Sequence, residues 1–421
     1  MSLKRFECHS HSEFSNIRLL DCINKIPNLI NQAIEIGLSG IALTDHECLC
    51  GAVQLNKIQY EIKEKYPYFK TAIGNEIYLV DSRDKGIKYY HYILIAKDEI
   101  GFKQLRILSS RSWLQSYYDR GLERVPTLKS ELEEIVRREP GHLIATSACL
   151  GGELSSCVVE LEHARRLGDE QEAILKYNQI INFLNWNINL FGDDFYIECA
   201  PSASREQIIA NKKLIEIARA FNIKMVIGSD SHFLKKEDRY VHKAYLNSKG
   251  GEREVDAFYE YAYLQDEKDI ITNLTPSIVD AYEWMCNNSM EIYNKIEIYS
   301  LAKPQKVPTV PIKIYPKKDV NIEYPTLKTL YNSDDIYDRY WINECEKSLK
   351  EKNLFDKKEY WEELEYEADI KKYVGEKLGT NVFAYPITLQ YYINLIWDCG
   401  SPLGAGRGSS MAGLNHYLLG E

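Results

Sequence analysis

The chain has 421 residues, of which 45% are apolar and 27% charged, and its formal net charge is −10. This length predicts two domains, and the composition is that of a globular protein without the run of roughly 20 apolar residues that crosses a membrane. The N-terminal residues do not resemble a signal sequence, so we expect a cytoplasmic protein without a membrane partner. The negative charge argues against a surface that binds nucleic acid everywhere, but it leaves room for a local basic groove.

Short strand-like runs alternate with helical patterns along the first two thirds of the chain. The runs lie at 6–9, 40–44, 71–74, 92–95, 143–146, 195–197 and 224–227. Apolar residues recur at helical spacing between them, at 26–36, 128–138, 170–184 and 204–220. Seven strand-then-helix units predict a parallel α/β barrel, in which the residues at the carboxyl ends of the strands converge on one face.

Residues of metal-ligand type lie at or just after the ends of most of these runs. They are His9, His11, Asp45, His46, Glu76, Cys149, Asp230 and His232. Asp21 lies between the first two runs, and His91 begins its run, which indicates a strand of opposite direction or a displaced register. In an extended His-x-His or Asp-x-His both side chains point the same way, so both can reach one ion.

The mixture of imidazole, carboxylate and thiolate suits Zn, Mn or Fe better than Mg or Ca. Without Asp45, nine candidate ligands remain, which exceed what one ion needs, so a cluster of two or three divalent ions is expected. Such a cluster activates water and holds the attacking and leaving oxygens of a displacement at phosphorus. The pattern therefore predicts phosphoester hydrolysis.

Each motif by itself has a simpler explanation. A single His-x-His is more often a surface or core pair, and Asp45 with His46 fits a turn. Cys149 before two glycines fits a small buried apolar residue. Their joint placement after strands favours the metal site. Glu153 and Glu198 are expected to support ligands rather than to bind metal themselves.

The ordered motifs resemble the PHP domain at the N-terminus of the bacterial replicative DNA polymerase III alpha subunit. The matching segments are His9-Ser10-His11, Leu19-Leu20-Asp21, Leu43-Thr44-Asp45-His46, Gly74-Asn75-Glu76, His91-Tyr92-Ile93, Ser147-Ala148-Cys149-Leu150 and Asp230-Ser231-His232. The resemblance implies a distorted seven-unit PHP barrel followed by a partial α+β palm.

The family's metal positions map onto nine residues, all of ligand type: His9, His11, Asp21, His46, Glu76, His91, Cys149, Asp230 and His232. A complete set implies retained metal binding and a metal-dependent 3′–5′ exonuclease activity, with His9, His11, Asp230 and His232 as the catalytic residues. Asp45 is then expected to orient His46 rather than to bind metal.

A proline-rich segment marks the predicted end of the PHP domain. Five of the thirteen prolines lie at 304, 308, 311, 316 and 325. Because proline fixes φ and removes a donor, residues 301–330 are expected to connect a domain at 1–300 with one at 331–421.

The last stretch holds the glycine-rich string Gly404-Ala405-Gly406-Arg407-Gly408-Ser409-Ser410, which is typical of a phosphate-binding loop. It resembles the Gly-Ser motif of the same polymerase's palm, which implies that Arg407, Gly408 and Ser409 contact the incoming nucleoside triphosphate. Ala405 replaces the family's usual proline. The palm aspartates, which would use Mg, follow this motif in the family, so this chain alone is not expected to polymerise DNA.

The leading hypothesis is therefore the N-terminal part of a replicative polymerase. Its implied partners are DNA, deoxynucleoside triphosphates, the rest of the polymerase, a proofreading exonuclease subunit and the sliding-clamp complex. Arg111, Arg120 and Arg124 are candidate DNA contacts, although solvation explains them equally well. One alternative is a stand-alone phosphatase of a small phosphomonoester. Another is a structural docking module in which metal only stabilises the fold.

Overall fold

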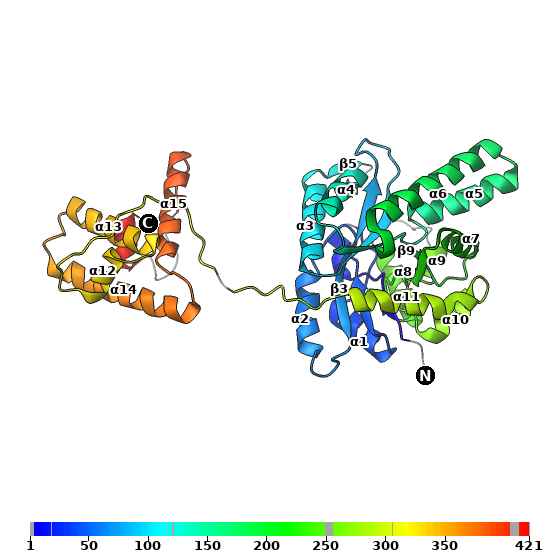
Figure 1. Cartoon of the computed structure of the whole chain (residues 1–421), viewed down its shortest axis with the longest axis horizontal. Helices are drawn as coiled ribbons and strands as arrows, with labels where there is room; N and C mark the ends of the chain where they lie inside the picture. The colour runs from blue at the N-terminus through cyan, green and yellow to red at the C-terminus, as the bar shows by residue number, and fades with distance from the viewer. Residues whose placement is uncertain are drawn as a thin grey trace. The chain divides into compact units, whose positions relative to one another are not determined.

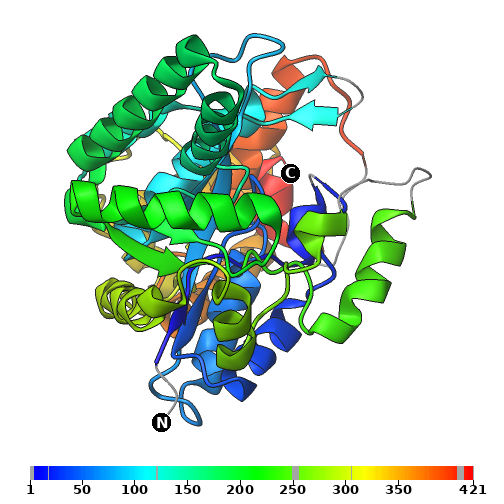
Figure 2. The same cartoon turned by 90° about the vertical axis from the view of Figure 1, so that its right-hand side faces the viewer.

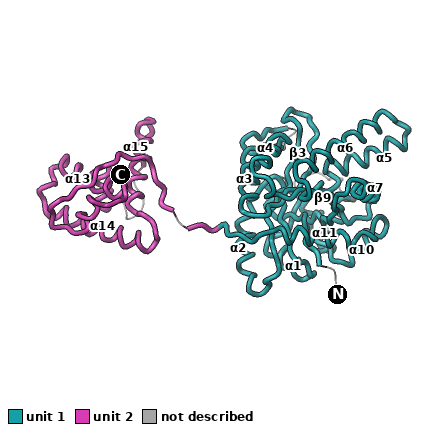
Figure 3. Tube along the Cα trace, viewed as in Figure 1, with its two compact units in different colours: residues 1–301 teal, residues 302–421 magenta. Residues whose placement is uncertain are grey.

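The computed structural model describes residues 4–17, 19–119, 122–248, 256–304, 306–404 and 412–420. The chain divides into two compact units, residues 1–301 and 302–421, which are coloured separately in Figure 3. Each unit has a hydrophobic core of its own.

An eight-stranded sheet organises the first unit (Figure 1). Seven strands follow one another in the order β1 (Phe6–Glu7), β2 (Gly40–Leu43), β3 (Lys70–Val80), β4 (Tyr90–Ala96), β8 (Leu143–Thr146), β9 (Phe195–Cys199) and β10 (Lys224–Ile227). The eighth, β7 (Thr127–Leu128), pairs with the end of β3. A parallel bridge between Ser10 and Ser231 joins the first strand's exit to the last, so the sheet is a nearly closed barrel.

The seven expected runs all lie in these strands, which confirms the barrel prediction. Neighbouring strands are parallel except at β4, which runs antiparallel to both β3 and β8. The reversed direction inferred from His91 is therefore confirmed. It lets a residue at the beginning of β4 share a rim with residues at the ends of the other strands.

Helices cover the outside of the barrel (Figures 1 and 2). They are α1 (Ile26–Glu35), α2 (Ala52–Ile62), α3 (Glu99–Leu114), α4 (Lys129–Arg138), α5 (Glu153–Leu167), α6 (Glu170–Phe191), α7 (Arg205–Phe221), α8 (Arg239–Leu246), α9 (Asp256–Tyr259), α10 (Glu267–Leu274) and α11 (Tyr282–Lys295). The large core lies between helices and sheet. A smaller apolar cluster joins alternate strand residues, such as Ile93 and Ile95, to Ile292 and Ile296 at the end of α11.

Close strand packing makes Gly40 sensitive to substitution. A Cβ atom there would lie 2.2 Å from the Lys70 carbonyl oxygen and 2.9 Å from the Phe6 ring. Because strand backbone cannot yield as a flexible side chain does, Gly40→Ala is expected to lower the free energy of unfolding of the first unit by about 1–3 kcal/mol. Urea denaturation followed by circular dichroism measures this, and an unchanged midpoint would contradict the close β2–β3 packing.

The second unit is helical in its described residues. Its helices are α12 (Pro325–Tyr331), α13 (Ile336–Glu351), α14 (Lys358–Leu378), α15 (Ala384–Asp398) and α16 (Leu414–Leu419). They pack around the fully buried Trp341. The expected α+β palm segment therefore shows helices, and no strand, within 306–404 and 412–420.

The proline-rich segment is not a free connection over its whole expected length. Its described residues before α12 have neither helix nor strand, but Val310 is buried in the second core, and Ile312 and Ile322 pack against it. Pro325 begins α12, where its missing N–H group needs no partner. Much of 301–330 thus belongs to the second unit.

Candidate metal centre

Nine side chains of ligand type converge at the rim of the barrel. They come from the exits of β1, β2, β8 and β10, from the middle of β3, from the start of β4 and from the loop before α1. All nine are buried except His91, whose side chain is 24% exposed. The rim brings together the residues His9, His11, Asp21, His46, Glu76, His91, Cys149, Asp230 and His232. Glu76, expected just after a strand, lies inside β3, which continues to Val80.

The first group of donors is formed by His9, His11, Glu76 and Asp230, whose ligand atoms all lie within 4.8 Å of one another. The two Nε2 atoms of His9 and His11 are 3.0 Å apart. His11 Nε2 lies 3.1 Å from both Glu76 Oε2 and Asp230 Oδ1. Two imidazoles and two carboxylates thus face one point.

The second group contains His11, His46 and His232. The Nε2 atoms of His46 and His232 are 3.4 Å apart, and Asp21 Oδ2 lies 3.3 Å from the first and 3.7 Å from the second. Asp21, which follows no strand, therefore joins this group from the loop before α1.

The third group contains Glu76, His91 and Cys149. His91 Nδ1 contacts Glu76 Oε1 and lies 3.7 Å from Cys149 Sγ. Glu76 also reaches the first group and lies 2.8 Å from His46 Nδ1, so its carboxylate is shared by all three sets of donors. His11 belongs to two of them.

The spacing of these atoms fits divalent metal ions. Bonds of about 2.1 Å place neighbouring ligands of a tetrahedral or octahedral ion about 3.0–3.4 Å apart, which is the separation found here. Asp21 Oδ1, His46 Nδ1 and Glu76 Oε1 are buried and make no geometrically acceptable hydrogen bond with any described residue. Buried ligand atoms without a hydrogen-bond partner are satisfied when a metal ion lies between them.

Groups behind the histidines fix their ring orientation. His9 Nδ1 lies 2.6 Å from Glu198 Oε1, His11 Nδ1 lies 3.2 Å from Ser15 Oγ, and His232 Nδ1 lies 2.9 Å from the Asp230 carbonyl oxygen. If each Nδ1 carries the proton, each Nε2 lone pair points into the site. The contact with Glu198 is the one that its expected supporting role requires. Glu153 instead lies 3.0 Å from Lys129 Nζ.

Asp45, which was expected to orient the His46 ring, is held by Ser12 and Ser15. The Asp45 carboxylate accepts hydrogen bonds from the Ser12 N–H, at 2.7 Å, and from the hydroxyls of Ser12 and Ser15. Because Ser15 Oγ also contacts the His11 ring and accepts from the His46 N–H, Asp45 acts on the site through Ser15.

Glu7 was not predicted, although it lies directly beneath the site. Its fully buried carboxylate accepts from the backbone N–H groups of His9 and Ser229 and pairs with Arg5 Nη1 at 2.5 Å. It thus links the exits of β1 and β10, which deliver His9 and Asp230. The sequence did contain a signal for this pair: Arg5 and Glu7 are charged residues at alternate positions of an apolar run, and buried charges need a partner.

The charges of the centre influence one another strongly. Burial by itself would raise the pKa of Glu76, but His91 and His46 outweigh it and hold this pKa well below its usual range. Burial lowers the pKa of His9, whereas Asp230 and Glu198 raise it well above its usual value. Burial, with Asp230 and Glu76 adding to it, raises the pKa of the Cys149 thiol. Metal binding must therefore displace protons from this site.

Strained backbone adjoins the ligands. Glu47, Ala148 and Asp230 have φ angles of 52°, 58° and 47°. Non-glycine residues with such angles cost on the order of 1–3 kcal/mol unless a side chain such as aspartate tolerates them. The strain is concentrated next to His46, at Asp230 and beside Cys149.

The residues predicted to contact nucleoside triphosphate and DNA are not among the nine donors of the metal centre. Arg407, Gly408, Ser409 and Arg120 lie outside the described residues. Arg111 is held by Glu134 through two hydrogen bonds, of 2.8 and 3.2 Å, which makes it a poor DNA contact. Arg124 donates to the Tyr89 hydroxyl at 2.8 Å.

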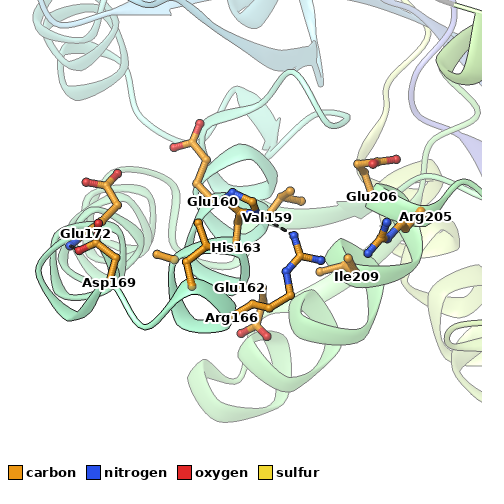
Figure 4. Close-up of a pocket in the computed structure, with 12 residues that line it drawn as sticks. Val159, Glu160, Glu162, His163, Arg166, Asp169, Glu172, Arg205, Glu206 and Ile209 are labelled. Carbon is orange, nitrogen blue, oxygen red and sulfur yellow. Dashed lines mark hydrogen bonds between the residues drawn. The ribbon is translucent and has the colours of Figure 1, made fainter.

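A separate surface groove lies among α5, α6 and α7 (Figure 4). Its charged lining is mostly acidic, namely Glu160, Glu162, Asp169, Glu172 and Glu206, with Arg166 and Arg205. None of the nine candidate ligands lines it. Because carboxylates repel phosphate, this groove does not suit the phosphoester chemistry of the rim.

Comparison with known proteins identifies a PHP domain and polymerase relatives. The model of the PHP domain matches residues 7–202. The DNA-directed DNA polymerase of Bacillus phage SPbeta is 36% identical over 98% of this chain and 34% of its own length. The DNA polymerase III alpha subunit of Borreliella burgdorferi is 28% identical over 98% of this chain and 32% of its own, and that of Aquifex aeolicus is 29% identical over 100% and 34%.

The chain contains a PHP domain and is homologous to DNA polymerase III alpha subunits. This confirms the resemblance drawn from the motifs. The chain spans about a third of the length of these relatives. Seven of the nine rim donors lie within the matched PHP region, and the other two, Asp230 and His232, follow β10, the last strand of the barrel. Among the described residues, no helix is both long and apolar enough to span a membrane.

Proposed function

We propose that the chain is part of a replicative DNA polymerase of the alpha-subunit type, and that its PHP domain hydrolyses phosphodiester bonds at the 3′ end of DNA. The observation that carries the hydrolytic role is the convergence of nine buried donors on adjoining points that share the Glu76 carboxylate. Homology to polymerases over 98% of the chain favours DNA over a small phosphomonoester as substrate.

Two or three divalent ions, of the Zn, Mn or Fe type, would supply an activated water and neutralise charge on the scissile phosphate. His9, His11, Glu76 and Asp230 would hold the substrate side of the cluster, while Glu198 keeps the His9 ring in place. The nearly complete burial of the donors excludes bulk water from the phosphate and strengthens every charge interaction there.

The whole polymerase would add nucleotides elsewhere, using deoxynucleoside triphosphates and Mg. In that activity Arg407, Gly408 and Ser409 would contact the triphosphate. A proofreading exonuclease subunit and the sliding-clamp complex are its proposed partners, and the cytoplasm is its proposed compartment.

The hydrolytic role is tested with the purified chain. His9→Ala and Asp230→Ala are each expected to reduce cleavage of 3′-labelled DNA by more than about 100-fold, because each removes a donor of the first group. His163→Ala, in the groove of Figure 4, is the matched control and should cleave normally. A small phosphomonoester is assayed beside the DNA, and metal content is measured in every variant.

The outcomes separate the alternatives. Bound metal without cleavage of either substrate would favour the docking module. Preference for the phosphomonoester would favour a phosphatase. DNA shortening that persists in both variants would point to a contaminant and contradict the proposal.

A further inference from the structure

A column of stacked rings leads away from the metal centre. The Tyr78 ring stacks on His91, with centroids 4.8 Å apart and planes at 15°. The Tyr89 ring stacks on Tyr78 in turn, with centroids 4.9 Å apart and planes at 9°. The column begins at a candidate ligand and ends at half-buried Tyr89.

Strand alternation explains why these rings line up. Glu76 and Tyr78 are two residues apart on β3, and Tyr89, which directly precedes β4, is two residues from His91 on that strand, so the extended backbone places each pair on one face. Tyr78 and His91 are direct partners in the antiparallel register. The column is therefore the continuation of the ligand-bearing face along the β3–β4 ribbon beyond the rim.

Arg124 covers the outer end of the column. Its guanidinium carbon lies 5.1 Å from the Tyr89 ring centroid, and Nη1 donates to the Tyr89 hydroxyl at 2.8 Å. It comes from β6 (Leu122–Arg124), which forms a two-stranded hairpin with β5 (Tyr117–Asp119), visible in cyan in Figure 2. Tyr117 is its direct partner in that hairpin, so the two side chains lie on one face.

Arg124 differs from other basic side chains of the first unit because its hydrogen-bond partner is not a carboxylate. Arg83 pairs with Glu131, Lys88 with Glu160, Lys129 with Glu153 and Arg111 with Glu134. Within the described residues no carboxylate lies within 4.0 Å of the Arg124 guanidinium, which contacts only a neutral phenol. Its positive charge is therefore available to an anion, and the neighbouring Tyr117 ring supplies flat apolar surface.

We infer that Tyr117 and Arg124, which Tyr89 positions, bind the single-stranded end of a DNA substrate whose 3′ terminus enters the metal centre. Arg124 contacts a backbone phosphate and the Tyr117 ring packs against a base, which is how single strands are bound without sequence preference. Tyr89 holds the Arg124 guanidinium in place. Three contacts of 4.8, 4.9 and 5.1 Å separate Arg124 from the His91 ring, a length that a few nucleotides span. This inference rests on the proposed function.

Binding is measured with a phosphorothioate-linked oligothymidylate, which resists cleavage, by fluorescence anisotropy over a range of salt. Arg124→Gln and Tyr117→Ser are each expected to raise Kd by at least about fivefold. Arg124→Gln should also reduce the salt slope of log K by about 0.7, the value for one single-strand phosphate contact. Arg111→Gln, which is paired with Glu134, and Tyr118→Ser, on the other hairpin face, are matched controls that should leave both values unchanged.

Cleavage provides the second readout. In Arg124→Gln the kcat/KM for an ordinary oligonucleotide should fall by the same factor as the affinity, while hydrolysis of bis(p-nitrophenyl) phosphate, too small to reach Arg124, stays normal. Unchanged Kd and salt slope in Arg124→Gln, an equal loss in Arg111→Gln, or equal binding of duplex DNA would each overturn the inference. If the wild type binds as expected but hydrolyses neither substrate, the binding surface stands and the hydrolytic function fails.

Discussion

Glu76→Gln is expected to lower the metal content of the purified chain by more than one ion and to reduce DNA cleavage by more than about 100-fold. Its carboxylate lies 3.1 Å from His11 Nε2 and 2.8 Å from His46 Nδ1, and it also contacts His91. An amide offers one neutral oxygen in place of two charged ones, so adjoining ions lose their shared ligand. Elemental analysis after dialysis and the initial rate of cleavage measure the two effects.

Two further variants provide a comparison for the metal content of Glu76→Gln. His91→Ala removes a donor from one group only and should cost one ion. Glu198→Gln keeps every donor but weakens the support of His9, so metal should remain at saturation with about 10–100-fold lower affinity. If Glu76→Gln lost no more metal than His91→Ala, the shared role of the carboxylate would be refuted.

The largest stability effect is expected at Glu7. Glu7→Ala should lower the free energy of unfolding of the first unit by about 3–5 kcal/mol, because it leaves the buried Arg5 charge unpaired. It also leaves the N–H groups of His9 and Ser229 without their acceptor. Urea unfolding followed by circular dichroism measures the loss, with the transition of the second unit analysed separately.

The matched control is Glu61→Ala, which removes a glutamate from an exposed pair with Lys57 on the same unit. That change should stay within about 0.5 kcal/mol. Because Glu7 also holds the backbone that precedes Asp230, Glu7→Ala should weaken metal binding as well. Equal stability of the two variants would mean that the Arg5–Glu7 pair contributes nothing.

Much of the barrel and its rim was predictable from local patterns. Period-two alternation and short apolar runs located all seven strands, and the place of His91 at the start of its run indicated the reversed β4. Because parallel strands end at the same edge, ligand types after those runs had to converge. Seven of the nine donors follow from this rule and the β4 exception. Asp21 was singled out only by its residue type, and Glu76 was expected just after a strand but lies in the middle of β3.

Other features depend on contacts between segments far apart in the chain. Asp45 lies next to His46, yet the fold turns its carboxylate to Ser12 and Ser15. The hairpin that carries Arg124 reaches the β3–β4 ribbon through β7, which no short-range pattern indicates. The packing of 310–322 on the second core likewise depends on where apolar side chains find a surface.

The sequence by itself determined which residue types reach the rim, because strand period and strand end are local properties. Only the tertiary structure decided how those residues are used. It made Glu76 a shared carboxylate, placed Glu7 beneath the strand exits and left Arg124 without an acidic partner, since each depends on distances between residues that the chain order does not fix.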